Sequence, residues 1–518
     1  MRTLMLLVAA LGLARLAVAA PPTYVATPVG PFTGGWQSEA LGISPSGDVT
    51  GWAEGNGGGH AFIYSGGVLR DLGTLGGNFS QGNSINASGQ VAGNSYVAAS
   101  SPGRGFMWTG AAMIELGIPG ATSAAYSINA SGDVVGYTGL GPETSATRAF
   151  LYHGGSLVLL PTLGGNDGRA YGINDRGQIT GSSSLPSAAY GYPQHAFLYS
   201  NAGLVDLGTL GGYSSIGYAI NANGDVAGSS EYVAGSSLQH AFLYSNGQMR
   251  DIGGRVAGRS WGYGINASLT VVGQADTNGL YQSKPIQHAF VYVDGEMHDL
   301  NLLTSGLNGI VLAYAAGIND NGQIVAYGYP AKAGLPILGF RLDPAGKATF
   351  PAPSPAVEFY HAAFDHYFQS ADPKEIGDLD SGVHKGWVRT GKTFAVYASS
   401  ATGMRPVCRF YIPPAKGDSH FFSASADECA DVLNKTQTDP AYAGYVYETS
   451  AAFYVALPDV TTGACPIGMI AVYRLWNGRT DSNHRYTTDL AVRAEMVAKG
   501  YIAEGYGPGR VAMCATGP

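Results

Sequence analysis

The sequence has few charged residues and no long apolar run beyond its first residues. Only 12% of the 518 residues are charged, and the formal net charge of −8 includes no basic run. Proteins that bind phosphate backbones concentrate Lys and Arg, so we expect neither nucleic acid nor an anionic membrane surface as a partner. Past the N-terminus no stretch is long enough to span a bilayer, so we expect no membrane span in the mature chain.

Cysteine is missing from the first three quarters of the chain. All four cysteines follow residue 407, at Cys408, Cys429, Cys465 and Cys514. An even number in an exported protein indicates two disulfides, whereas the cysteine-free part must be held by packing alone.

Short catalytic motifs are also missing. The sequence contains no Gly-x-Ser-x-Gly elbow, no His-Glu-x-x-His pair and no Gly-rich phosphate loop. We therefore expect no catalytic residue, no metal ligand and no cofactor. Enzymes with repeat-built folds can collect catalytic groups from several loops, so an enzyme remains the alternative.

The N-terminus has the pattern of a secretory signal. Arg2 precedes an apolar run from Leu4 to Leu13, and Ala17-Val18-Ala19 supplies small residues for cleavage. We expect residues 1–19 to be removed and the protein to be extracellular, at the cell surface or in the periplasm. An uncleaved anchor is the alternative.

Seven similar units follow the signal. Each contains the pattern Ile-Asn-x-x-Gly-x-Val/Ile-x-Gly or a close variant, at spacings of 42, 43, 45, 47, 45 and 53 residues. The units begin at Ile43, Ile85, Ile128, Ile173, Ile220, Ile265 and Ile318. Together with 77 Gly and 32 Tyr, this regularity favours a turn-rich β protein.

The fourth unit shows how one repeat is built. Tyr171–Asn174 and Gln178–Gly181 form a hairpin, and His195–Tyr199 and Leu204–Leu210 give two further strands. Four short strands per unit are typical of a propeller blade. The sequence therefore predicts a mainly β fold, with a seven-bladed propeller over residues 20–350. The last unit has a degenerate fourth strand, and we expect the strand at Tyr24–Val29 to replace it.

Four of the units carry the phrase His-Ala-Phe, at His60, His195, His240 and His288. Together with the hairpin pattern and the Asp-Leu-Gly-Thr-Leu-Gly-Gly tail, this phrase resembles the bacterial extracellular HAF repeat family over roughly residues 24–345. Two units have Arg104 and Arg148 at the His position. The resemblance implies an exported repeat protein without established chemistry. We expect these His residues to form hydrogen bonds between blades rather than to bind a ligand.

A second repetition begins after prolines 351, 353 and 355, which mark residues 351–355 as a stiff linker. Its three segments each pair two aromatic strands and then give a helix start signal. The strand pairs are Glu358–Tyr360 with Asp365–Phe368, Cys408–Tyr411 with Ser419–Phe422, and Val472–Trp476 with Asn483–Tyr486. The pattern predicts a smaller α+β domain over residues 356–518 with pseudo-threefold, β-trefoil-like closure. Of the three possible pairings, Cys408–Cys429 and Cys465–Cys514 keep each disulfide within one segment.

The phrases Cys408–Tyr411, Tyr473–Asn477, Asn483–Thr488 and Glu504-Gly505 resemble the DUF5648 family, across roughly residues 356–516. The resemblance implies a domain of exported bacterial proteins and no activity.

Aromatic, Arg and His side chains of this domain are the candidate ligand-binding residues. An apolar ring beside polar groups suits a sugar, although core packing is the alternative for each ring. The candidates are His420, His484, Tyr445, Trp476, Arg474 and Tyr501. Three histidines, His366, His420 and His484, could instead meet at a threefold axis and suit Zn²⁺.

The sequence as a whole favours a secreted, non-enzymatic and monomeric binding protein. The expected partner is an extracellular polysaccharide or a surface protein. A hydrolase or lyase acting on glycans through the central pocket of the propeller is the alternative, and a purely structural surface protein is a third possibility. Fold alone cannot choose among them.

Overall fold

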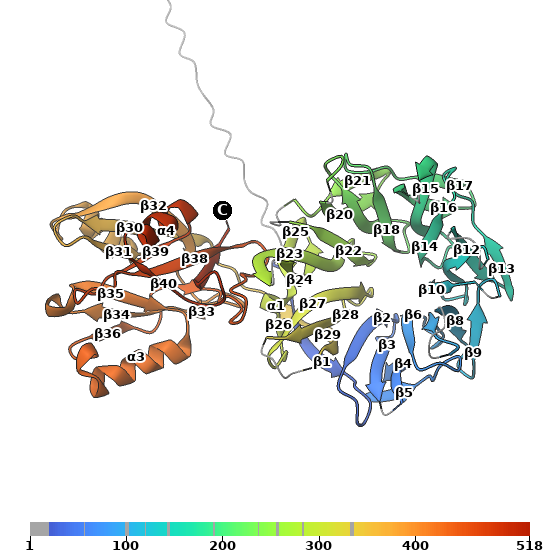
Figure 1. Ribbon diagram of the computed structural model, residues 1–518, viewed down its shortest axis with the longest axis horizontal. Coiled ribbons are helices and arrows are strands. Elements are labelled where there is room, and N and C mark those ends of the chain that lie inside the picture. Colours follow the sequence, from blue (N-terminus) through green and yellow to red (C-terminus); the bar gives the residue numbers. More distant parts are fainter. Residues whose placement is uncertain are drawn as a thin grey trace, which may run out of the picture.

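A computed structural model describes residues 20–517, except 56, 99–102, 120, 142–145, 190–191, 237, 255–257, 282–283 and 332–335. The expected signal segment, residues 1–19, lies outside the described residues. The described chain is mainly β, and a ring of small sheets lies beside a second group of sheets and helices (Figure 1). No helix in this part of the chain is long and apolar enough to cross a membrane.

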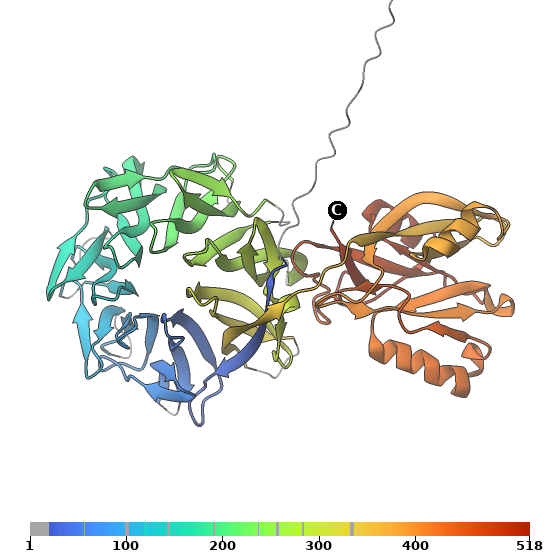
Figure 2. The same cartoon turned by 180° about the vertical axis from the view of Figure 1, so that it is seen from behind.

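Seven sheets surround the middle of the ring, and in six of them the chain runs from the innermost to the outermost strand (Figure 2). The innermost strands are β2 (Ser38–Ile43), β6 (Ser80–Ile85), β10 (Ser123–Ile128), β14 (Gly168–Ile173), β18 (Ser215–Ile220), β22 (Ser260–Ile265) and β27 (Ile310–Ile318). The second strands are β3 (Val49–Gly55), β7 (Val91–Ser95), β11 (Val134–Gly139), β15 (Ile179–Ala189), β19 (Val226–Glu231), β23 (Val271–Tyr281) and β28 (Ile324–Pro330).

The outer half of each sheet follows the same order. The third strands are β4 (Gly58–Ser65), β8 (Arg104–Trp108), β12 (Thr147–His153), β16 (Tyr192–Ser200), β20 (Gln239–Ser245), β24 (Lys284–Val293) and β29 (Leu338–Lys347). The fourth strands of the first six sheets are β5 (Val68–Asp71), β9 (Met113–Leu116), β13 (Ser156–Leu159), β17 (Gly203–Asp206), β21 (Gln248–Asp251) and β25 (Glu296–Asp299).

The N-terminal strand completes the last sheet. Strand β1 (Pro22–Val29) pairs antiparallel with β29, with Val29 opposite Gly339. This pairing was predicted from the degenerate end of the seventh unit and is confirmed. The longer interval before that unit contains helix α1 (Leu300–Leu303) and β26 (Thr304–Ser305), which pairs parallel with β1 as a fifth strand.

Asparagine side chains join neighbouring sheets. The Asn of each Ile-Asn turn accepts hydrogen bonds from its own turn, and its Nδ2 donates to a backbone carbonyl of the next sheet. Asn174 donates to Asn221 at 2.9 Å, and Asn221 donates to Asn266 at 3.1 Å. At the end of the series Asn319 donates to the Ser44 carbonyl of the first sheet at 3.0 Å. Hydrogen bonds between neighbouring sheets, expected for His, are formed by Asn and Ser side chains, for example from the Ala61 N–H to the Ser80 hydroxyl.

The repeated histidines have partners inside their own sheets. His60 Nδ1 lies 2.9 Å from an oxygen of Asp71, and His195 Nδ1 lies 2.9 Å from Asp206. The expectation that these side chains form hydrogen bonds between neighbouring units was wrong. The third and fourth strands are antiparallel neighbours, so His and Asp eleven residues apart meet within one sheet. Where Arg104 replaces His, Glu115 replaces Asp, and their charges pair at 3.1 Å.

The C-terminal part contains a nine-stranded and a three-stranded sheet with three α-helices. Its first segment comprises β30 (Pro353–His361), β31 (His366–Ser370), α2 (Pro373–Asp380) and β32 (Trp387–Tyr397). The second comprises β33 (Arg405–Pro406), β34 (Cys408–Ile412), β35 (Ser419–Ser423), α3 (Ala426–Thr438), β36 (Val446–Thr449) and β37 (Tyr454–Val455), with 3₁₀ turns at Pro414–Lys416 and Pro440–Tyr442. The third comprises β38 (Met469–Trp476), β39 (His484–Thr487), α4 (Leu490–Ala498), β40 (Ile502–Glu504) and β41 (Val511–Thr516).

The start of this part differs from expectation. Strand β30 begins at Pro353, inside the expected linker, and its first residues pair only with β32 because β31 ends at Ser370, opposite Val357. Proline is tolerated there because the other edge needs no N–H donor. Helix α4 is capped by Asp489, whose carboxylate accepts from two backbone N–H groups.

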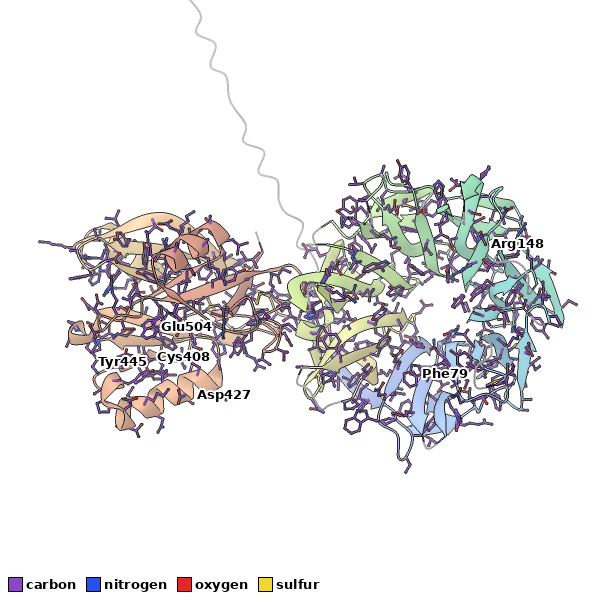
Figure 3. All side chains as sticks on the ribbon, in the orientation of Figure 1. Phe79, Arg148, Cys408, Asp427, Tyr445 and Glu504 are labelled. Atoms are coloured by element: carbon purple, nitrogen blue, oxygen red, sulfur yellow. A yellow bond between two sulfur atoms is a disulfide. The ribbon has the colours of Figure 1, made fainter. Side chains whose placement is uncertain are left out.

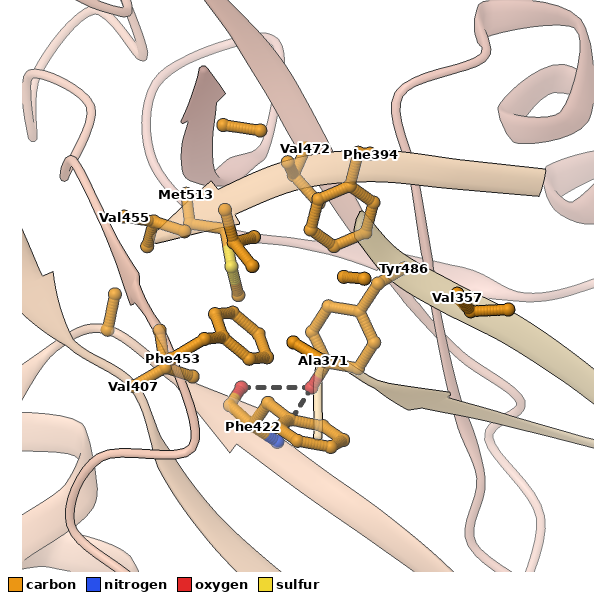
Figure 4. Packing of buried hydrophobic residues seen from close by; sticks show 14 of the residues in the cluster. Val357, Ala371, Phe394, Val407, Phe422, Phe453, Val455, Val472, Tyr486 and Met513 are labelled. Carbon is orange, nitrogen blue, oxygen red and sulfur yellow. Dashed lines mark hydrogen bonds between the residues drawn. The ribbon is translucent and has the colours of Figure 1, made fainter. Parts of the chain in front are cut away.

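Aromatic residues from all three segments form one core. Figure 4 shows Tyr486 beside Phe422, Phe453 and Phe394, and its hydroxyl both accepts from and donates to the backbone of Phe422 at 2.9 Å. Disulfides join Cys408 to Cys429 and Cys465 to Cys514, the pairing that keeps each bridge within one segment.

Candidate functional site

Four of the six candidate residues line one cleft, between the second and third segments. The cleft has a volume of about 630 Å³, which is in the range of small-ligand sites. The four are Tyr445, Arg474, Trp476 and His484. Figure 3 labels Tyr445 and Glu504, which also lines the cleft.

Arg474 forms part of the cleft wall. The residue is only 6% exposed, and its guanidinium holds Glu428 through two bonds of 2.6 and 2.9 Å and Glu504 through one of 2.9 Å. Burial alone would raise the pKa of Glu428, but the hydrogen bonds and charge of Arg474 outweigh it, and the pKa lies below its ordinary value. The carboxylates are thus charged and fixed.

His484 lies against the same group. Its Nε2 is 3.5 Å from Glu504, and its side chain is 9% exposed. Burial lowers the pKa of His484, which favours the neutral imidazole. Its Nδ1 is buried and has no hydrogen-bond partner among the described residues.

Three aromatic rings line the outer part of the cleft. Trp476 is partly exposed, and its indole N–H donates to the Ser482 hydroxyl at 3.1 Å. The rings of Tyr442 and Tyr445 lie 5.3 Å apart, and Lys435 Nζ is 5.4 Å from the Tyr442 ring. The rings have fixed neighbours and accessible surface, and they give the cleft apolar faces. Acidic and basic side chains also line the cleft, so it combines these faces with charges of both signs.

The other two candidates lie outside the lining. Tyr501 is 8% exposed and packs with Leu475, Val492 and Met496 in a small core. His420 lies 3.3 Å from Glu448 and packs on Phe368.

The three histidines of the repeat do not share a site. His366, His420 and His484 lie beside three different carboxylates, those of Asp481, Glu448 and Glu504. Within the described residues no group of three or more His, Cys, Asp or Glu side chains could hold a metal ion.

The Arg–Glu contact recurs between segments. Arg409, in the strand equivalent to that of Arg474, contacts Glu375 at 2.9 Å and Glu448 at 2.7 Å. At the remaining junction the charges exchange places, because Glu358 stands at the Arg position and pairs with Arg485 at 2.9 Å. The first segment, which diverges most in sequence, therefore keeps an ion pair of reversed polarity.

Sequence reasoning missed several residues of the cleft. Tyr442, Lys416, Lys435 and Arg479 all line it. Tyr442 lies in the 3₁₀ turn after α3, and Lys416 is held by its bonds to the carbonyls of residues 440 and 441. Glu428 lies in the first turn of α3, and the helix start signal there does not report its contact with Arg474.

A family described as "Domain of unknown function (DUF5648)" matches residues 338–447. The match covers the first segment and most of the second, and supports the resemblance seen in the C-terminal part. The family comparison does not show the HAF resemblance. No curated protein matches the chain.

Solved structures similar to this chain contain propeller-like folds. The β-propeller domain of the trilobed protease from Pyrococcus furiosus is 11% identical, with 51% of this chain and 81% of that chain covered and a TM-score of 0.36. An acylaminoacyl peptidase from Pyrococcus horikoshii is 12% identical (57% and 50% covered, TM-score 0.36), so this chain spans half its length. A gluconolactonase from Xanthomonas campestris is 10% identical (63% and 98% covered, TM-score 0.30). Similarity this distant carries no argument about activity.

Proposed function

We propose that this chain is an exported, non-enzymatic protein that binds an extracellular polysaccharide through the cleft between the second and third C-terminal segments. In this proposal the seven sheets are the blades of a closed propeller, and the C-terminal part is a pseudo-threefold domain docked on it. The carrying observation is that Trp476, Tyr442 and Tyr445 line one cleft beside charged hydrogen-bonding groups. Sugars present apolar C–H faces and polar edges to such a surface.

The state of the carboxylates favours binding over hydrolysis. A glycosidase needs one carboxylic acid with a raised pKa to protonate the leaving group. Glu428 and Glu504 are both bonded to Arg474, and for each the pKa lies below its ordinary value although burial alone would raise it. The two carboxylates are therefore suited to accept hydrogen bonds from sugar hydroxyls and not to donate a proton.

A glycan array with the full oxidised chain tests this function, followed by titration calorimetry with a polysaccharide that binds. Trp476→Ala should weaken binding roughly tenfold, as the loss of one stacking face does. The thermal transition should change little, whereas loss of a core Trp would cost about 3–5 kcal/mol. Trp36→Ala is the matched control, since Trp36 is 55% exposed on the propeller part.

Two results would contradict the proposal. One is a correctly folded chain that retains no polysaccharide on a broad array. The other is equal affinity of the wild type, Trp476→Ala and Tyr445→Ala. If Trp476→Ala unfolds the protein, Tyr445→Ala alone carries the test.

A further inference from the structure

The middle of the ring contains a second cavity, of about 550 Å³, lined by the innermost strands of the seven sheets and by Tyr327 of β28. Six tyrosines line it, from the third to the seventh sheet: Tyr126, Tyr171, Tyr218, Tyr263, Tyr314 and Tyr327. We call these residues the tyrosine arc. All six are partly exposed.

The tyrosine arc is continuous. The ring of Tyr171 lies 5.0 Å from that of Tyr126 and 5.5 Å from that of Tyr218. The series continues through Tyr263 and Tyr314 at 5.2 and 5.5 Å. Such packing fixes the rings, so a ligand would meet a wall that is already ordered.

The opposite wall, from the first two sheets, is of a different kind. Leu41, Gln81 and Asn83 line the cavity there. The Asn83 amide donates to the Ala125 carbonyl at 2.8 Å and accepts from Gln81 at 2.9 Å. The cavity thus has an aromatic side and an amide-bearing side.

The lining determines the class of ligand. Among the described residues that line the cavity, none is charged. Burial raises the pKa of Tyr218 to about 12, so this phenol stays neutral at physiological pH. A charged ligand would lose hydration here and find no ion-pair partner in the lining itself, whereas a neutral sugar can stack its C–H face on the rings and form hydrogen bonds through its hydroxyls.

A further cavity extends the space toward the C-terminal part. It measures about 720 Å³ and shares Tyr314 and Tyr327 with the central cavity. Asp459, Thr461 and Thr462 of the C-terminal part line its far side. Because the two cavities share lining residues, a ligand longer than one sugar ring could contact both.

We call the central cavity and its extension toward the C-terminal part the central channel. We propose that the central channel binds a neutral oligosaccharide against the tyrosine arc, as a site separate from the charged cleft of the C-terminal part. The proposal does not depend on that cleft binding anything, because the two sites have different lining residues and different chemistry.

Titration calorimetry of the full chain with cellohexaose, maltohexaose and mannohexaose tests the channel, and tetragalacturonate serves as the charged comparison. At least one neutral hexaose should bind, and Tyr218→Ala should weaken it roughly tenfold. Tyr213→Ala is the matched control, since Tyr213 is 50% exposed on the neighbouring loop. Trp476→Ala should leave this binding unchanged, which separates the channel from the cleft.

Leu41→Trp gives a second variant if Tyr218→Ala does not fold, because a larger side chain on the opposite wall should fill the cavity and abolish binding. The proposal is overturned if none of the three neutral hexaoses binds, if tetragalacturonate binds more tightly than all of them, or if folded channel variants bind like the wild type.

Discussion

Asp299 accepts a hydrogen bond from the backbone N–H of Ile467, 2.9 Å away, and so joins the sixth sheet to the C-terminal part. The same carboxylate contacts His288 Nδ1 at 2.6 Å. In the neighbouring sheet the equivalent Asp251 side chain is 37% exposed, whereas that of Asp299 is 0% exposed. One member of the repeated His–Asp series has thus become an attachment point between two parts of the chain.

Replacing Asp299 by Asn should loosen this attachment. The neutral amide cannot accept equally from His288 and from the Ile467 N–H, and a buried imidazole then loses its charged partner. Hydrogen–deuterium exchange of the peptide containing Ile467 should become faster. Asp251→Asn is the matched control, and equal exchange in the two variants would argue against the attachment.

The same contact predicts a pH dependence. Burial would lower the pKa of His288, but Asp299 and Asp459 outweigh it and hold the pKa above 6.5. For Asp299, His288 and two backbone N–H groups outweigh burial and hold the pKa below 3.8. The His288–Asp299 pair therefore contributes its full stabilisation of the folded protein between about pH 4 and 6.5. This contribution is lost as the pH rises through the raised pKa of His288, and also as the pH falls through the lowered pKa of Asp299.

Protection of the Ile467 amide, corrected for the intrinsic pH dependence of exchange, should accordingly fall as the pH rises above 6.5. In His288→Gln this fall should disappear, because the glutamine does not titrate, while His240→Gln should behave like the wild type. A His288→Gln protein with the wild-type pH profile would refute the assignment.

Much of the repeat was readable from the sequence because its turns depend on local chemistry. Ile-Asn-x-x-Gly places an Asn whose side chain caps its own turn, and this pattern located all seven innermost strands. The completion of the last sheet by Tyr24–Val29 followed from one missing strand. The attachment of Ile467 to Asp299 could not be predicted, because residues 168 apart meet only through tertiary packing.

The candidate site was predicted only in part, again because tertiary packing cannot be read from local sequence. Residue type identified Trp476 and Tyr445, but type alone could not separate them from Tyr501, which has the same place in its segment as Tyr445 and packs in a core. The difference lies in the neighbours. Tyr442 follows α3 in a 3₁₀ turn and widens the aromatic wall beside Tyr445.

Arg474→Met should lower the free energy of unfolding by about 3–5 kcal/mol, because it leaves Glu428 and Glu504 without their shared cation in a partly buried site. Arg479→Met is the control, since Arg479 is 40% exposed and pairs with Asp365 and Asp481 at the surface. Exposed pairs of this kind contribute about 0–1 kcal/mol. Urea denaturation of the oxidised proteins measures both free energies of unfolding. If Arg474→Met lowers the free energy of unfolding no more than Arg479→Met does, the Arg474 ion pairs do not stabilise the fold as proposed.

Asn221 offers a test of the connections between sheets. Its side chain accepts from the Asn223 and Asp225 N–H groups at 2.9 Å and donates to the Asn266 carbonyl of the next sheet at 3.1 Å. Asn221→Ala removes the acceptor of the two turn N–H groups and leaves the Asn266 carbonyl only its bond from the Leu269 N–H. Each group that is left unpaired out of reach of water costs about 1–3 kcal/mol. Asn223→Ala, two residues along the same turn, changes an exposed side chain and should have an effect within about 0.5 kcal/mol.

The two variants also distinguish a local effect from one on the whole ring. If Asn221 joins neighbouring sheets, exchange at the backbone amides of β22 as well as β18 should accelerate in Asn221→Ala, because the lost bond crosses from one sheet to the other. If the Asn only caps its own turn, faster exchange should be confined to residues 221–225. Finding the second pattern would show that packing of the sheets, and not the asparagine series, holds neighbouring sheets together.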